Sequence, residues 1–416
     1  MGAGISGIVA AHLLSRQYQV TLLEKRPRLG GHTHTWEIPD GPDEGTRVDT
    51  GFIVCNDKTY PNFHRFLNEL EVPWRWSDMS FGFWDERTNL HYAGTNLDGL
   101  FAQRSNALRP GFLAMLLEIR RFCRESMAAL ENNPAELEGR TLGGWLRDRR
   151  FGQTMIDNYL VPMGAAIWST SPKKMLRFPA LTYIRFFKNH GLLSLADRPR
   201  WQTVKGGSDR YVEAFQRQFN GTIRTGISIA TIKRNGAEVD VHTVDGEQFS
   251  GDHLVMAVHA DQVLPLLEKP TEAEEQIFSQ WRYERNRVVL HTDTSVMPPS
   301  RRAWASWNYT REAEAEPDDA LSMSYHMNRL QGLRTRREYL VTLNRKGRID
   351  ERRIIAEFVY NHPLYTRASL ATQDRIYELN GDKHTYYCGA WCFNGFHEDG
   401  TRSAVRVAKA LGVDWG

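Results

Sequence analysis

Cysteine is scarce in this chain, with four residues among 416. So few cysteines do not build a disulfide framework, which excludes the small secreted scaffolds. Cys388 and Cys392 are spaced too widely for a C-x-x-C pair, and no neighbouring cysteine or histidine completes a zinc-binding set. We therefore expect no metal site and a reducing, cytoplasmic setting.

Long apolar runs and a strong net charge are absent as well. No stretch approaches the roughly 18–20 apolar residues of a membrane-spanning helix. A formal net charge of +3 does not indicate a nucleic-acid partner. The chain has 41% hydrophobic and 25% charged residues, the composition of an ordinary globular protein. At this length it is expected to form two or three domains.

The first motif that carries chemistry stands at the start of the chain. Residues 2–7 (GAGISG) fit the pattern G-x-G-x-x-G, and residues 8–15 form a predicted helix. Residues 19–24 then form a predicted buried strand that ends in Glu24. In this arrangement the glycines allow a tight turn, close approach of a pyrophosphate, and helix–strand packing, while the acid accepts ribose hydroxyls. The pattern predicts a dinucleotide site at the helix N-terminus.

The hydrophobic strand that should precede this fingerprint is missing, because only Met1 stands before Gly2. That strand is normally central in the sheet, with a partner on each side. We therefore expect that the natural chain begins further upstream, with Met1 at the position of the strand's last aliphatic residue. The alternative is a degraded, non-functional copy.

Two further glycine motifs follow. Residues 28–31 (RLGG) place a second backbone turn beside the pyrophosphate, and residues 386–391 (YYCGAW) and 395–400 (GFHEDG) stand near the other end of the chain. With these motifs in this order, the chain resembles the FAD-dependent amine oxidase and phytoene desaturase superfamily. Residues 49–54 (DTGFIV) resemble the superfamily segment whose backbone passes close to the flavin.

A narrower resemblance extends over nearly the whole chain. It is to a bacterial group of NAD/FAD-binding flavoproteins that are often encoded beside cyclopropane-fatty-acid synthases. The segments that carry it are residues 178–180, 186–193, 198–201, 206–212, 325–331 and 395–400.

The resemblance implies an α/β fold. A doubly wound FAD-binding domain, Rossmann-like and of the glutathione-reductase type, would be interleaved with an α+β substrate domain. The FAD-binding domain would comprise residues 1–57, 205–265 and 380–416. The substrate-binding domain would comprise residues 58–204 and 266–379.

The middle of the chain shows patterns of its own. Residues 81–84 and 89–92 predict two strands around a polar turn. Residues 108–128 predict a helix with an apolar side and arginines toward its end. Such a helix either packs on the domain with its arginines in water, or contacts an anionic membrane peripherally at the inner face. Strands expected within residues 286–345 would form the floor of a substrate cavity, and its expected lining is Trp304, Trp307, Tyr309, Tyr325 and Met327.

The resemblance implies that the cofactor is FAD, bound by both ends of the chain. The backbone of Ile229 would meet the adenine, and Asp399 would accept a hydrogen bond from the ribityl chain. The helix over residues 401–411 would direct its positive end toward the flavin. The residues expected at the cofactor are Gly2, Gly4, Ile5, Ser6, Glu24, Lys25, Gly31, His32, Thr33, Ile229, Gly389, Phe396, His397, Glu398 and Asp399.

The expected activity is that of an FAD-dependent oxidoreductase that takes hydride from a C–H bond of a hydrophobic substrate. A fatty-acyl chain is the expected substrate, in desaturase or dehydrogenase chemistry. His190 and His326 are candidates for proton transfer, and Trp391 for an aromatic contact at the reacting group.

Three alternatives stay open at this point. They are a flavin amine oxidase, a redox-neutral FAD-dependent fatty-acid double-bond isomerase, and an inactive flavoprotein scaffold. Ala390 and Trp391 stand where amine oxidases usually carry Thr-Glu, and no lysine matches their flavin-contacting position. Both departures weaken the case for an amine substrate.

Overall fold

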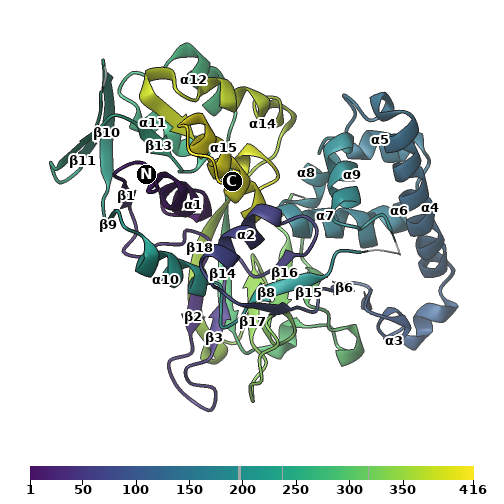
Figure 1. Cartoon of the computed structure of the whole chain (residues 1–416). Coiled ribbons are helices and arrows are strands. Elements are labelled where there is room, and N and C mark those ends of the chain that lie inside the picture. Colours follow the sequence, from purple (N-terminus) through teal and green to yellow (C-terminus); the bar gives the residue numbers. More distant parts are fainter. Residues whose placement is uncertain (195–197, 237, 317) are drawn as a thin grey trace.

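The computed structural model describes residues 1–194, 198–236, 238–316 and 318–416. It has two parts that differ in architecture (Figure 1). One holds both chain ends and two separate two-stranded parallel pairs, and the other holds a large sheet with a layer of helices beside it. The predicted α/β fold is confirmed.

The part with the chain ends is built on two parallel strand pairs. Strand β1 (Thr21–Glu24) pairs with β9 (Thr222–Thr225), and β13 (Leu254–Met256) pairs with β19 (Thr385–Tyr387). Hydrogen bonds of the first two residues connect the pairs. The N–H of Gly2 donates to Leu23 O at 2.8 Å, and the N–H of Ala257 donates to Met1 O at 2.8 Å. Met1 therefore takes a strand position between β1 and β13, as the sequence predicted.

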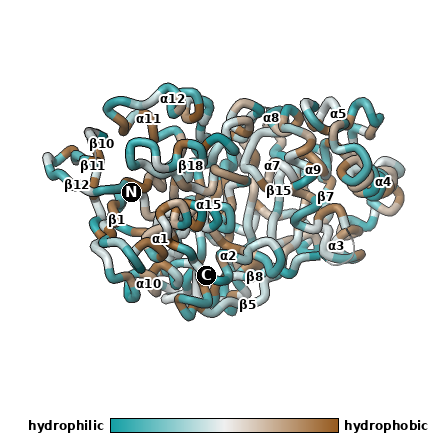
Figure 2. The backbone as a smooth tube through the Cα atoms, turned by 45° about the horizontal axis from the view of Figure 1, so that its top comes forward, coloured by the Kyte–Doolittle hydropathy of each residue, from teal (hydrophilic) through white to brown (hydrophobic). Residues whose placement is uncertain are grey.

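Helix α1 (Ile5–Leu14) begins inside the first glycine motif, three residues before the predicted start, and ends one residue before the predicted end. Nine of its ten residues are buried, and Figure 2 shows it as mainly hydrophobic. Helix α15 (His397–Ala410) packs against it, because Gly400 has no side chain to separate the two helices. A Cβ on Gly400 would lie 2.7 Å from Cγ2 of Ile5. Both helices therefore begin near the same place.

The large sheet has seven strands and collects segments from two distant stretches of the chain. Its order is β18 (Ile354–Pro363), β14 (Tyr283–His291), β17 (Leu340–Leu343), β16 (Ser322–His326), β15 (Trp307–Arg311), β6 (Phe81–Asp85) and β7 (Leu90–Ala93). Strands β6 and β7 are the hairpin predicted for residues 81–92, and β15 joins β6 in parallel.

A helical layer stands beside this sheet (Figure 1). Its longest member is α4 (Pro110–Asn132), which covers the helix predicted over residues 108–128 except for its first two residues. Helices α7 (Val161–Trp168) and α9 (Ala180–Asn189) belong to the same layer. Within the described residues, no helix is both long and apolar enough to cross a membrane.

The expected division into domains stays a prediction, and one helix bears on where it should be drawn. Helix α2 (Pro61–Glu69) contributes Phe63 and Phe66 to the hydrophobic core that α1 and α15 share. It therefore packs with the part that holds the chain ends, although it follows residue 57 in sequence.

Candidate cofactor and active site

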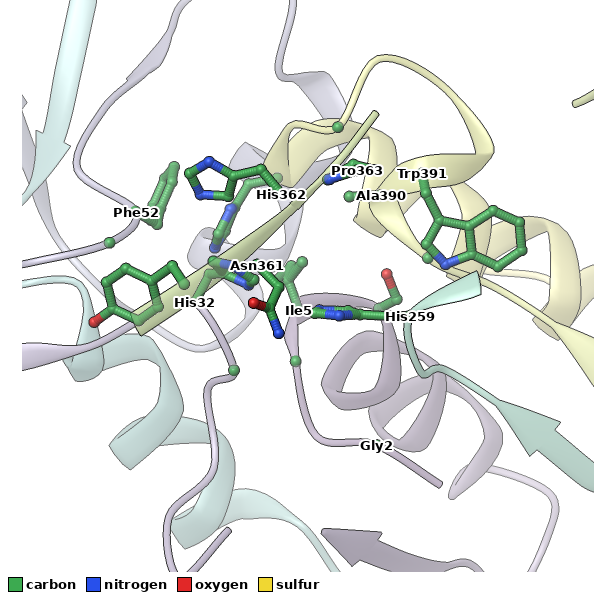
Figure 3. Close-up of a pocket in the computed structure, with 18 of the residues that line it drawn as sticks. Gly2, Ile5, His32, Phe52, His259, Asn361, His362, Pro363, Ala390 and Trp391 are labelled. Carbon is green, nitrogen blue, oxygen red and sulfur yellow. The ribbon is translucent and has the colours of Figure 1, made fainter. Parts of the chain in front are cut away.

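A cavity of about 960 Å³ lies between the two parts of the molecule (Figure 3). Gly31 and Gly389 both line it, so glycine turns from opposite ends of the chain meet at one site. The volume falls at the upper end of the roughly 300–1,000 Å³ range of ligand and cofactor sites. The convergence that the sequence predicted is confirmed.

Each glycine of the first motif has a distinct environment. A Cβ on Gly2, whose φ is +87°, would lie 2.6 Å from Ala257 O, and one on Gly7 would lie 1.8 Å from Gly2 O. A Cβ on Gly4, by contrast, would meet no atom within 4 Å. Gly2 and Gly7 therefore allow the turn and the packing of α1, whereas Gly4 leaves the space in front of the helix open.

Helix α1 presents its N-terminus to this open space. Gly4 is its N-cap residue, and no side chain in the described part of the molecule caps it. The first N–H groups of the helix, at Ile5 and Ser6, therefore face the cavity as anion-binding donors. This is the arrangement that the pyrophosphate of FAD requires.

Glu24 marks the nucleotide end of the cavity. Its Oε2 accepts the N–H of Ala3 at 2.7 Å, and its Oε1 accepts the N–H of Arg26 at 2.9 Å. The backbone thus holds the carboxylate in place, while each oxygen keeps a lone pair for a ribose hydroxyl. Lys25 and Ile229, both expected at the cofactor, line the cavity as well.

The C-terminal motif closes the cavity from the other side. Phe396 and His397 line it, and the His397 ring stacks on Phe52 at 3.5 Å between centroids. Nε2 of His397 lies 2.9 Å from Oγ1 of Thr33. Burial lowers the pKa of His397 to about 3, so this ring is neutral at physiological pH.

Three expected cofactor residues lie behind the cavity wall rather than in it. Thr33 contacts His397, as described above, and the Glu398 carboxylate accepts the N–H of Phe63 at 2.9 Å. Asp399 accepts the N–H of Phe396 at 2.9 Å, and burial raises its pKa to about 7. These side chains therefore hold the start of α15 in place.

The expected catalytic residues are not brought together. Trp391 lines the cavity, and its indole N–H donates to Val258 O at 3.0 Å. His190 does not line the cavity. Its ring stacks on Phe186, and Phe186 in turn stacks on Phe396, which does line the cavity. His326 does not line it either, and its Nε2 lies 2.7 Å from a carboxylate oxygen of Glu338.

Two histidines that sequence reasoning missed do line the cavity. His259 follows strand β13, and His362 stands near the end of β18. The ring of His32 lies between them, 5.7 Å from His259 and 5.5 Å from His362 (Figure 3). Burial lowers the pKa of both His259 and His362 to about 4. Position near the carboxyl end of a buried strand was the available signal.

The large sheet and α7 supply an apolar, aromatic part of the lining. Of the five residues expected there, Trp307 and Tyr325 line the cavity, whereas Trp304, Tyr309 and Met327 are buried in hydrophobic cores elsewhere. The other large apolar residues of this part are Ile167, Trp168, Val288 and Leu343, and Trp201 of strand β8 (Trp201–Val204) lines the cavity as well.

No Asp, Glu, Lys or Arg of the described chain enters this part of the lining, because the charged lining residues all belong to the nucleotide end. They are Glu24, Lys25, Arg26 and Asp261. The indole N–H of Trp307 is buried without a partner among the described residues. The site thus combines a polar end with an apolar end.

Comparison with known proteins agrees with this geometry. The family model described as flavin-containing amine oxidoreductase matches residues 5–335. The protein named flavin-containing monoamine oxidase AofH, from Mycobacterium tuberculosis, is 25% identical over 299 residues. That alignment covers 68% of this chain and 61% of AofH, so the chain spans less than two thirds of its relative's length.

Solved structures share the fold. A fatty acid isomerase from P. acnes, described as producing CLA, has a TM-score of 0.69 at 14% identity, covering 97% of this chain and 95% of that one. Putrescine oxidase with bound putrescine has a TM-score of 0.69 at 12% identity, covering 99% and 97%. Cyclohexylamine oxidase from Brevibacterium oxydans has a TM-score of 0.66 at 15% identity, covering 99% and 98%.

Proposed function

The chain belongs to the flavin-containing amine oxidoreductase family, and we propose that it oxidises a C–H bond of a hydrophobic substrate, with a fatty-acyl chain as the first candidate. It is an FAD-dependent oxidoreductase. When bound, FAD supplies the acceptor for the hydride. The residues of the chain hold the cofactor, position the substrate and exclude water from the reacting bond.

The observation that carries the proposal is the apolar end of the cavity. Its wall is built from residues such as Trp168, Val288 and Leu343, and it presents no charged side chain among the described residues. An alkyl chain loses nothing by entering such a space, whereas an ammonium group would lose its hydration without gaining a carboxylate.

The roles of the cofactor-lining residues belong to the same proposal. The N-terminus of α1 would bind the pyrophosphate, and Glu24 would accept the ribose hydroxyls. Gly31, His32 and Gly389 would stand beside the flavin half of the cofactor. The domain division of the sequence analysis is retained, with α2 assigned to the FAD-binding part because it packs there.

The test is anaerobic reduction of the FAD-loaded protein. Free fatty acids, acyl thioesters and phospholipids are mixed with it in turn, and loss of the oxidised flavin absorbance is followed. Bleaching by an acyl substrate, together with a new double bond in the product, would support the proposal. Bleaching by primary amines alone, with release of aldehyde, would instead establish amine oxidation.

A redox-neutral isomerase is the second candidate, favoured by the same apolar lining. The fold neighbour named as a fatty acid isomerase shares the architecture over 97% of this chain. Isomerisation would convert an unsaturated fatty acid with no net consumption of an electron acceptor. Product analysis with and without an added acceptor separates this reaction from desaturation.

We also propose that an exposed face at α4 binds an anionic lipid surface. Leu113, Leu117, Arg120 and Arg124 are exposed at helical spacing on that helix, and Leu108 precedes it with 86% exposure. Neither Arg120 nor Arg124 forms an ion pair with any residue that the structure describes. Exposed leucines beside unpaired arginines match the acyl and anionic headgroup layers of a membrane.

A further inference from the structure

A chain of hydrogen bonds leads from the large sheet, through the buried Asn286, to His362 in the cavity. It begins at the backbone N–H of Arg287, which donates to Oδ1 of Asn344 at 2.9 Å. Nδ2 of Asn344 donates to Oδ1 of Asn286 at 2.7 Å. Nδ2 of Asn286 then lies 3.2 Å from Nδ1 of His362.

The direction of every bond in this chain follows from its first member. A backbone N–H can only donate, so the atom of Asn344 that faces Arg287 must be the oxygen. The amide nitrogen of Asn344 therefore faces Asn286, and the amide oxygen of Asn286 must accept the hydrogen bond from it. The amide nitrogen of Asn286 is left to face His362. A second contact agrees, because the same nitrogen donates to the carbonyl oxygen of Glu284 at 3.0 Å.

The protonation of His362 follows in turn. Because an amide NH₂ group donates, Nδ1 of His362 accepts and carries no hydrogen. Burial lowers the pKa of this ring to about 4, so the ring is neutral and its one N–H is at Nε2. Asn286 is fully buried, and reversing its amide would place its oxygen against the carbonyl of Glu284. Such a reversal leaves buried polar groups unpaired, which is costly.

We propose that His362 is a fixed hydrogen-bond donor of the reaction site, held in its Nε2–H form by Asn286 and Asn344, and that its ligand is an acceptor atom of the bound flavin or of the substrate. His362 is thus the residue that contacts the ligand, and the two asparagines are positioning residues. The inference rests on the proposed function only for the identity of the acceptor. The tautomer itself is independent of substrate.

The direct test is the nitrogen NMR spectrum of histidine-labelled, FAD-loaded protein. The His362 signals are identified as those absent from the His362→Gln variant. We expect Nδ1 to show the shift of an unprotonated imidazole nitrogen and Nε2 that of a protonated one. The opposite pattern in the wild-type protein, or a mixture of both tautomers, would overturn the inference without any further variant.

The Asn286→Asp variant tests whether Asn286 sets the tautomer of His362. The substitution keeps the shape but replaces the donor by an acceptor, so we expect Nδ1 of His362 to become protonated. Asn308→Asp is the matched control, because Asn308 is also fully buried in the large sheet and donates to Ala305 O at 2.7 Å, yet does not line the cavity. The control should leave the His362 signals unchanged. Unchanged signals in Asn286→Asp would contradict the positioning role.

Binding measurements then distinguish the two sources of the acceptor. If the acceptor is on the flavin, Asn286→Asp should shift the flavin absorption bands and weaken FAD binding about tenfold, the effect of one lost hydrogen bond. If it is on the substrate, the flavin spectrum stays constant and a long-chain fatty acid binds about tenfold more weakly. Neither effect would overturn the donor role. A wild-type protein that binds no fatty acid, yet shows the Nε2–H form, would contradict only the acyl proposal.

Discussion

Gly31 lies directly against Gly4, so close that a Cβ on Gly31 would stand 2.9 Å from Cα of Gly4. The N–H of the preceding Gly30 donates to Ala3 O at 2.8 Å, which fixes the two turns side by side. Two glycine motifs separated by more than twenty residues thus form one surface in front of α1. The cofactor site depends on this contact, because any side chain on Gly31 would push the turns apart.

We predict that Gly31→Ala weakens FAD binding at least tenfold. The added methyl group meets Gly4, and φ of +60° at this position is unfavourable for alanine. Gly246→Ala is the matched control, because Gly246 has a φ of +86° but open space around its Cβ position. Titration with FAD, followed by fluorescence quenching, measures both variants. Equal losses in the two proteins would show that backbone strain, rather than the contact, causes the effect.

Trp307→Phe should separate substrate binding from stability. The substitution removes an indole N–H that is buried without a partner in the described structure, so the free energy of unfolding should fall little. Because Trp307 forms part of the cavity wall, the smaller ring should contact an acyl chain less well, and KM for the acyl substrate should rise about threefold, roughly the loss of one buried methylene contact. Urea unfolding and steady-state kinetics test the two parts. A large stability loss with unchanged KM would contradict the role assigned to Trp307.

Stability should fall as the solution is acidified below pH 6.5. Burial lowers the pKa of ten histidines of the described chain below the ordinary value, so in this range the unfolded chain binds more protons than the folded one. They are His32, His34, His64, His91, His190, His259, His291, His326, His362 and His397. Each histidine contributes stability that is fully present above about pH 6.5, the pKa in the unfolded chain. This stability is lost as the pH falls toward the lower pKa of the folded protein.

Five carboxyls of the described chain oppose this trend. Burial raises the pKa of Asp49 and of Asp399 to about 7, and it also raises the pKa of Asp209, Asp261 and Glu398. The histidines outnumber them, so the net slope between about pH 5 and 6.5 should be positive. Replacing His291 by glutamine should reduce the slope of the unfolding free energy with pH by up to about 1.4 kcal/mol per pH unit, the contribution of one titrating proton. Urea unfolding across this range measures it. If the unfolding free energy of the wild-type protein stays constant or falls as the pH rises across this range, the prediction is wrong.

Binding to anionic membranes should depend on the exposed leucines of α4. We expect the double variant Leu113→Ser and Leu117→Ser to lose most of its binding to vesicles that contain phosphatidylglycerol. Pure phosphatidylcholine vesicles should bind the wild-type protein weakly, since they offer no charge to the arginines. Val244→Ser is the control, because Val244 is 67% exposed in the other part of the molecule. Co-sedimentation gives the bound fraction, and equal binding by wild type and double variant would refute the α4 face.

The local motifs could be predicted because their chemistry depends on neighbouring residues. Glycines at fixed spacing permit one backbone path and open space at a helix N-terminus, and an acid at a strand end stands where ribose hydroxyls are bound. The structure places Gly4, Glu24, Gly31 and Gly389 around one cavity, as those patterns indicated. The hairpin of β6 and β7 could be predicted for the same reason, since alternation around a polar turn is a local signal.

The reactive end of the site could not be predicted in this way. His326 and His362 both stand at or near strand ends in the same sheet, yet only His362 lines the cavity. The difference depends on strand order and on which part packs beside each strand end. Likewise Asn286 and Asn344 are 58 residues apart, and only the pairing of β14 with β17 brings them together. The sequence by itself therefore determined the cofactor, because nucleotide binding depends on local backbone geometry. Tertiary structure alone decided which histidines line the cavity, because that depends on contacts between segments distant along the chain.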